Sequence, residues 1–191
     1  MDRRNMITAI ASVAASSTLL AGCSTNMGSG ATPAERRATI DKGFDKAMGD
    51  LYQSVSGTRE LASRARGILV FPNVIQAGFI IGGEFGDGAL RVGGKTTDYY
   101  RITAGSFGFQ AGGQSKAVIL MFLTESAFAN FRKSDGWTAG VNASVAVMRA
   151  GANAAVDTAT AKADIAGFAL ANAGLFAGAS IDGSKISKLE F

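Results

Sequence analysis

The residues of this chain that could perform catalysis do not form a recognisable catalytic set. Histidine is absent from the 191 residues, which removes the commonest general base and metal ligand and excludes a Ser-His-Asp or Cys-His site. A zinc site would have to be built from carboxylates, which is unusual for zinc. Glu84 and Asp87 form a carboxylate pair in a segment that reads as a hairpin turn, and Ser106 has no base near it in sequence. We therefore expect a protein that is not an enzyme and holds no cofactor or metal.

A glycine-rich run at residues 82–88 (GGEFGDG) invites comparison with phosphate-binding loops. Such a loop continues into Gly-Lys-Ser/Thr and opens a helix. Neither feature follows here, because the next residues have the pattern of another strand. A nucleotide site is therefore not expected at these glycines.

Basic side chains that precede this run could bind anionic groups. Five stand out, in two expected helices and the junction after them: Lys42, Lys46, Arg59, Arg64 and Arg66. Lysine and arginine donate charge-assisted hydrogen bonds to phosphate, and an amphipathic helix with lysines can contact lipid headgroups. The alternative is a solvated surface of mixed charge, because Asp41, Asp45 and Glu60 are interleaved with these cations. The residues alone leave both interpretations open.

The N-terminal segment has the composition of an export signal. Arg3 and Arg4 precede an uncharged apolar stretch at residues 6–20, and small residues follow it, as in a secretory signal. The stretch is shorter than the ~20 apolar residues of a membrane-spanning helix. It leads into Leu-Ala-Gly-Cys, which ends on Cys23, the single cysteine of the chain. These four residues resemble the bacterial lipobox, which implies cleavage of residues 1–22 and acylation of Cys23.

Acylation would place the protein on a membrane of the bacterial cell envelope. Two acyl chains already suffice for stable anchoring, so any lipid affinity of the folded domain would serve another purpose. Ser24 follows the cysteine, and by resemblance to Gram-negative sorting rules a residue other than aspartate there favours the outer membrane. Residues 23–31 are small and polar, as expected of a flexible tether. Residues 32–191 have the length of one domain with its own core.

The charge balance is mildly basic, with a formal net charge of +4. This excess suits contact with anionic headgroups. It is far from the basic stripe of a nucleic-acid-binding protein, so no nucleic-acid partner is expected.

The expected fold that positions these residues is α+β, with a compact, strongly curved antiparallel sheet or barrel-like core. Short apolar runs bounded by glycine, proline and asparagine predict strands, and glycines within them indicate bends or close approach of another backbone. An amphipathic helix from Thr32 to Val55 opens the domain, begun by a capping box of Thr32 and Glu35. Further helices are predicted at residues 58–65 and 125–133, and either a helix or a strand at 149–163. Strands are predicted at residues 68–71, 74–75, 79–81, 99–103, 106–110, 117–123 (the central, buried one), 139–147, 165–171 and 175–181, with turns at 72–73, 86–88 and 182–183.

Four separate blocks of the sequence resemble the SYLF lipid-binding domain family. They are ARGILVFP at residues 65–72, AGFIIGGE at 77–84, GSFGFQ at 105–110 and GLFAGASIDG at 174–183. The similarity covers roughly residues 40–190. It implies a domain that binds phosphoinositides or other anionic lipids, and in eukaryotic members the lipid contact is attributed to a basic, amphipathic N-terminal helix. The corresponding segment here carries Lys42 and Lys46, with the three arginines after it.

Two functions follow as hypotheses. In the first, the domain of a membrane-anchored lipoprotein binds anionic phospholipid headgroups. In the second, the domain is a scaffold that binds an unidentified envelope or host protein, without specific lipid recognition.

Overall fold

A curved sheet organises the computed structural model, which describes residues 31–78, 81–107, 114–148, 155–171, 174–175 and 181–191. The strand order is β5-β9-β3-β2-β1-β4-β7-β6, with β8 paired to β7. All pairings are antiparallel except that of β6 with β7. The strands are β1 Gly67–Gly78, β2 Ile81–Val92, β3 Lys95–Phe107, β4 Gln114–Phe122, β5 Trp137–Thr138, β6 Ala146–Val147, β7 Ile165–Ala171, β8 Gly174–Leu175 and β9 Lys185–Lys188.

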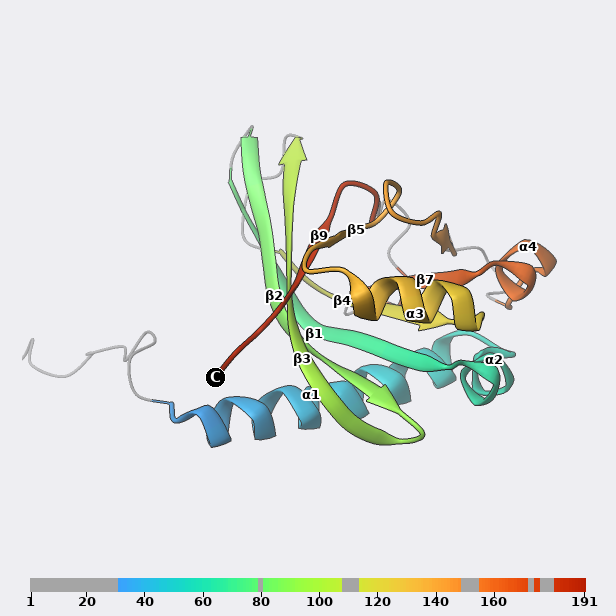
Figure 1. The fold of residues 1–191 in the computed structure, drawn as a ribbon, viewed down its shortest axis with the longest axis horizontal. Coiled ribbons are helices and arrows are strands. Elements are labelled where there is room, and N and C mark those ends of the chain that lie inside the picture. Colours follow the sequence, from blue (N-terminus) through green and yellow to red (C-terminus); the bar gives the residue numbers. More distant parts are fainter. Residues whose placement is uncertain (1–30, 79–80, 108–113, 149–154, 172–173, 176–180) are drawn as a thin grey trace, which may run out of the picture. The chain divides into compact units, whose positions relative to one another are not determined.

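Helices pack on both faces of this sheet. The helices are α1 Pro33–Ser54, α2 Thr58–Arg64, α3 Glu125–Lys133 and α4 Thr158–Lys162. Figure 1 shows α1 and α3 on opposite sides of the bent β1, β2 and β3 strands. The expected α+β class, the curved antiparallel sheet and the N-terminal helix are thereby confirmed. No helix in the described part of the chain is long and apolar enough to cross a membrane.

Alternation along the strands divides the buried side chains into two cores. On β4, Val118, Leu120 and Phe122 face the α3 side, where they meet Phe128 and Phe131 of that helix. The residues between them, Ile119 and Met121, face the α1 side. A strand with apolar side chains on both faces is typical of the interior of a sheet. The prediction of β4 as a central buried strand is therefore confirmed, since it lies between β1 and β7.

The helix predictions near the N-terminus are confirmed closely. The side-chain oxygen of Thr32 accepts a hydrogen bond from the backbone amide of Glu35, and the Glu35 carboxylate accepts one from the amide of Thr32, which completes the capping box. Helix α1 buries Ile40, Phe44 and Leu51 against the sheet. Helices α2 and α3 begin and end within one residue of the predicted bounds.

Two predicted turns are wrong, because both lie inside long strands. Residues 72–73 form a bulge within β1, where the register against β2 and β4 shifts. Residues 86–88 lie in the middle of β2, and the turn that follows is at Gly93 and Gly94, both with positive φ. Gly86 of β2 leaves room for the β1 bulge, because a Cβ at this position would lie 2.7 Å from the carbonyl oxygen of Asn73.

The C-terminal third departs furthest from the predicted elements. The strand predicted at residues 139–147 is wrong except for β6, because residues 140–142 form a turn. The prediction for β7 is confirmed to the residue, and the turn at Asp182–Gly183 is confirmed. Strands β5 and β9 were not predicted. The export signal, Cys23, most of the tether and parts of the segments predicted at residues 79–81, 106–110, 149–163 and 175–181 lie outside the described residues.

Candidate functional site

Helix α1 is held on the sheet by its aspartates. The Asp41 carboxylate accepts hydrogen bonds from the Tyr99 hydroxyl and the Thr96 hydroxyl of β3, each at 2.8 Å. Arg91 of β2 donates to the Asp45 carboxylate and to the backbone carbonyl of Asp41. Burial and the negative charge of Asp41 raise the pKa of Tyr99 to about 12. These contacts turn both aspartates towards β2 and β3.

A second ionic link joins the first turn of α1 to the sheet. The Asp87 carboxylate of β2 accepts two hydrogen bonds from Arg101 of β3, at 2.7 and 3.0 Å, and one from Arg36 of α1 at 3.0 Å. Burial alone would raise the pKa of Asp87, but the hydrogen bonds and positive charges of the two arginines outweigh it and lower this pKa. Asp87 is therefore a structural anchor for α1.

Two lysines of α1 are exposed on the same helix. Lys42 is exposed and has no ion pair among the described residues. Lys46 lies one turn further on and pairs with Asp50, Nζ to carboxylate oxygen, at 2.6 Å. Because exposed ion pairs of this kind contribute little, an incoming anion could compete with Asp50. The structure thus brings together the two lysines that the helical period predicted.

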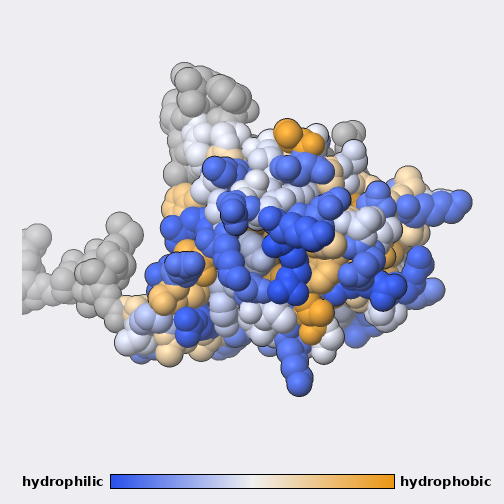
Figure 2. Space-filling view, viewed as in Figure 1, coloured by the Kyte–Doolittle hydropathy of each residue, from blue (hydrophilic) through white to orange (hydrophobic). Residues whose placement is uncertain are grey.

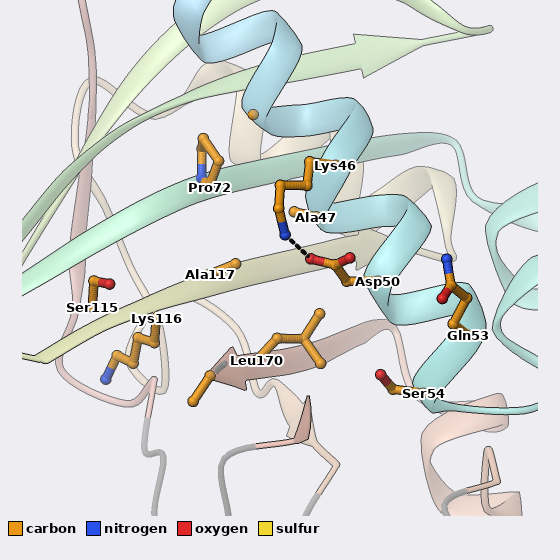
Figure 3. Close-up of a pocket in the computed structure, with 12 residues that line it drawn as sticks. Lys46, Ala47, Asp50, Gln53, Ser54, Pro72, Ser115, Lys116, Ala117 and Leu170 are labelled. Carbon is orange, nitrogen blue, oxygen red and sulfur yellow. Dashed lines mark hydrogen bonds and ion pairs between the residues drawn. The ribbon is translucent and has the colours of Figure 1, made fainter. Parts of the chain in front are cut away.

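Lys46 also lines a shallow pocket between α1 and the sheet (Figure 3). The pocket has a volume of about 320 Å³, and α1 contributes Gln53 and Ser54 to its polar wall, opposite β4 and β7. Lys116 of β4 adds no second ammonium group to it. Figure 3 shows that side chain pointing away from α1, and its Nζ lies 2.8 Å from the carboxylate of Glu84 on β2.

Arg59 lies at a larger hollow on the other side of α1. Its guanidinium stacks over the Tyr52 ring, 4.4 Å from the ring centroid. The hollow measures about 590 Å³ and lies between α1, α2 and the β2–β3 turn, with Phe44, Met48 and Ile68 among its apolar residues. In the described part of the chain no carboxylate pairs with Arg59, so its charge is available to a ligand.

The remaining predicted cations do not join this group. Arg66 points towards α3, where its Nε lies 3.8 Å from the carboxylate of Glu125. Arg64 is exposed at the end of α2. Figure 2 shows that hydrophilic residues cover much of the face in view, with small hydrophobic groups between them.

Several charged residues that shape this region were not predicted: Arg36, Arg91, Arg101 and Lys116. Their partners lie 14 to 51 residues away in sequence, so no local spacing marks them. The alternation of Asp87, Ala89 and Arg91 along one face of β2 was the available signal, but the turn predicted at residues 86–88 obscured it. In the described residues, no group of three carboxylate or cysteine side chains lies close enough together to hold a metal ion.

The comparison with known proteins concerns the C-terminal half of the domain. No curated protein matches the chain. Residues 103–190 match the model of the Ysc84 family, described as "Las17-binding protein actin regulator". The match runs from within β3 to the end of the sheet and includes two of the four SYLF-like blocks, at residues 105–110 and 174–183. Residues 103–190 of the chain are therefore similar to the Ysc84 (SYLF) family, as the resemblance of the four sequence blocks predicted.

Proposed function

We propose that this domain binds anionic phospholipid headgroups, phosphoinositides among them, on a protein that an acylated Cys23 anchors to the bacterial cell envelope. The observation that carries the proposal is the division of charge on α1. Asp41 and Asp45 are bound to residues of β2 and β3, while Lys42 and Lys46 are exposed to solvent. Arg91 thus offsets one of the two aspartate charges, and the hydroxyl groups of Thr96 and Tyr99 bind the Asp41 carboxylate.

The size of the expected effect follows from the charges. Each lysine near an anionic membrane surface contributes ~1 kcal/mol of attraction. Replacing exposed Lys42 by glutamine should therefore weaken binding about fivefold, since 1.4 kcal/mol corresponds to tenfold. Reversal of both lysines to glutamate changes the charge by four units and should cost about 4 kcal/mol before salt screening.

Vesicle flotation of residues 24–191 tests the proposal. The wild-type domain should float with vesicles that contain anionic lipid and remain behind with neutral ones. Lys42→Glu/Lys46→Glu should lose this binding. Lys133→Glu is the control for the single variant Lys42→Glu, because both change the charge by two units and Lys133 is an exposed lysine on α3, on the opposite face of the sheet. Equal binding to neutral and anionic vesicles, or equal loss in the control, would refute a role for the α1 lysines.

The membrane anchor has its own test. Fractionation of bacteria that express the full chain should recover it with the outer membrane, and labelled fatty acid should be incorporated. Cys23→Ser should abolish both. A Cys23→Ser protein that still incorporates fatty acid would show that a residue other than Cys23 is acylated.

A second candidate function is the binding of a protein. The description of the matched family supports it, because that family is named for binding Las17 and regulating actin. For this chain we infer only a scaffold that binds an envelope or host protein. Crosslinking in the native envelope should then recover a specific partner whose yield is unaffected by Lys42→Glu/Lys46→Glu.

A further inference from the structure

Two large apolar side chains lie uncovered on the outer part of the sheet. Phe85 of β2 is 49% exposed and Ile75 of β1 is 37% exposed. They are register partners in the β1–β2 pair, so their side chains are neighbours on one face. Their outer neighbours in register are Thr103 and Ser115, both exposed. We call Phe85 and Ile75 the apolar pair.

The apolar pair lies beside the N-terminal turns of α1. Successive side chains of a strand alternate between faces, so Phe85 and Asp87 share a face and lie about 7 Å apart along β2. Asp87 is hydrogen-bonded to Arg36 in the first turn of α1. The pair and the start of α1 are therefore on the same side of the domain.

Glycines leave the sheet bare next to Phe85. Gly83 and Gly105 are register partners, they share the face of Phe85, and both are exposed. A Cβ on Gly105 would meet nothing within 4 Å, and one on Gly83 would make only an ordinary contact of 3.9 Å. Packing among the described residues does not require these two glycines, in contrast to Gly86. What they create is a flat surface around a phenylalanine, suited to an extended flat partner.

We propose that the apolar pair enters the interface of the bilayer that anchors the protein. The inference rests on the acyl anchor in the proposed function. Nine residues lead from Cys23 to Thr32 at the start of α1. A chain of that length spans at most about 32 Å when extended and about 17 Å as a flexible coil. The anchor thus keeps the start of α1, and the apolar pair beside it, within reach of the same membrane.

The charges around the apolar pair favour contact with an anionic membrane. Arg36 and Arg101 share the single carboxylate of Asp87, so the three groups together carry one positive charge. Aromatic and aliphatic side chains bordered by cations are the composition with which proteins enter the headgroup region of anionic membranes. Phe85 and Ile75 would lie at the boundary between headgroups and acyl chains while the arginines meet phosphate.

Tryptophan fluorescence can test the contact in the full-length acylated chain. Trp137 is the single native tryptophan and is 1% exposed, so it supplies a constant background. The probe is Phe85→Trp in vesicles that contain brominated phospholipid. Its quenching should be at least twofold stronger than that of Val141→Trp. Val141 is 79% exposed and lies two residues from Ala139, a member of the core on the α3 side of the sheet. Ile75→Trp is the second probe, should Phe85→Trp fail to fold.

The outcomes separate the inference from the function on which it rests. If the protein is acylated and floats, but the Phe85→Trp and Ile75→Trp variants are quenched no more than Val141→Trp, the apolar pair does not contact the bilayer and the inference is overturned. Protection of the Phe85→Trp variant from a water-soluble quencher without quenching by bromolipid would show a second copy or another protein on the pair, which also overturns it. A wild-type chain that is not acylated and does not float would instead refute the anchor itself.

Discussion

Replacing Asp87 by asparagine should loosen α1 from the sheet. The substitution keeps the shape of the side chain but removes the charge that accepts three hydrogen bonds from Arg36 and Arg101. A hydrogen bond to a charged group contributes ~1.5–3 kcal/mol. That figure must be discounted here, because the Asp87 side chain is 23% exposed and those of the arginines are 42% and 45% exposed, where solvent screens charge. We expect a loss of about 1–2 kcal/mol in the free energy of unfolding.

The pH dependence gives this prediction a sharper form. The pKa of Asp87 is lowered in the folded protein, so its contribution to stability is complete above the ordinary aspartate pKa of 3.8. The contribution is lost as pH falls through the lower, folded-state pKa. The stability difference between wild type and Asp87→Asn should therefore be constant near neutral pH and shrink once the carboxyl group of the wild type is protonated.

Urea unfolding followed by circular dichroism would measure the difference at neutral pH and again below pH ~3. Thermal unfolding should show a melting temperature lowered by about 2–8 °C, from ~2–4 °C for each kcal/mol in a domain of this size. A difference that keeps its full size in acid would show that the carboxylate charge is not its source. An unchanged midpoint at neutral pH would refute the role of Asp87 as the anchor of α1.

Two further predictions probe the glycines and the Asp41 contact. Gly88→Ala should destabilise the domain by about 1–3 kcal/mol, because the new methyl group would lie 2.5 Å from the Phe71 ring. Denaturant unfolding would measure the loss of stability. The control is Gly105→Ala, which should be nearly neutral because there is open space around Gly105. Asp41→Asn should lower the pKa of Tyr99 from about 12 while leaving it above its ordinary value of 10.0, because burial is the larger cause of the shift. An NMR titration of the tyrosine rings would measure the change, and an unaltered Tyr99 pKa would argue against the hydrogen bond to Asp41.

The helices were predictable because the signals that define them are local. Thr32 and Glu35 are three residues apart, and the apolar stripe of α1 repeats within one turn. The burial of β4 was equally visible, because its apolar run continues without a break. The turn wrongly predicted at residues 86–88 shows where prediction from local sequence signals fails. A Gly-Asp-Gly sequence is typical of a hairpin turn, and only the close approach of the β1 bulge explains why β2 needs glycine there.

In the candidate site, too, local features were predictable from the sequence and contacts between distant segments were not. By itself, the sequence determined that Lys42 and Lys46 lie in one row along a helix, because residues four apart are separated by about one helical turn. It also determined the SYLF resemblance, which the match over residues 103–190 confirms. Where Asp41 and Asp45 point was decided by tertiary structure alone. Their partners on β2 and β3 are 46 to 58 residues away, and only the pairing of the strands carries those groups to the face on which α1 lies. The charge presented by α1 is thus set by contacts between distant segments, because Arg91 of β2 offsets one of the two aspartate charges that lie beside the lysines.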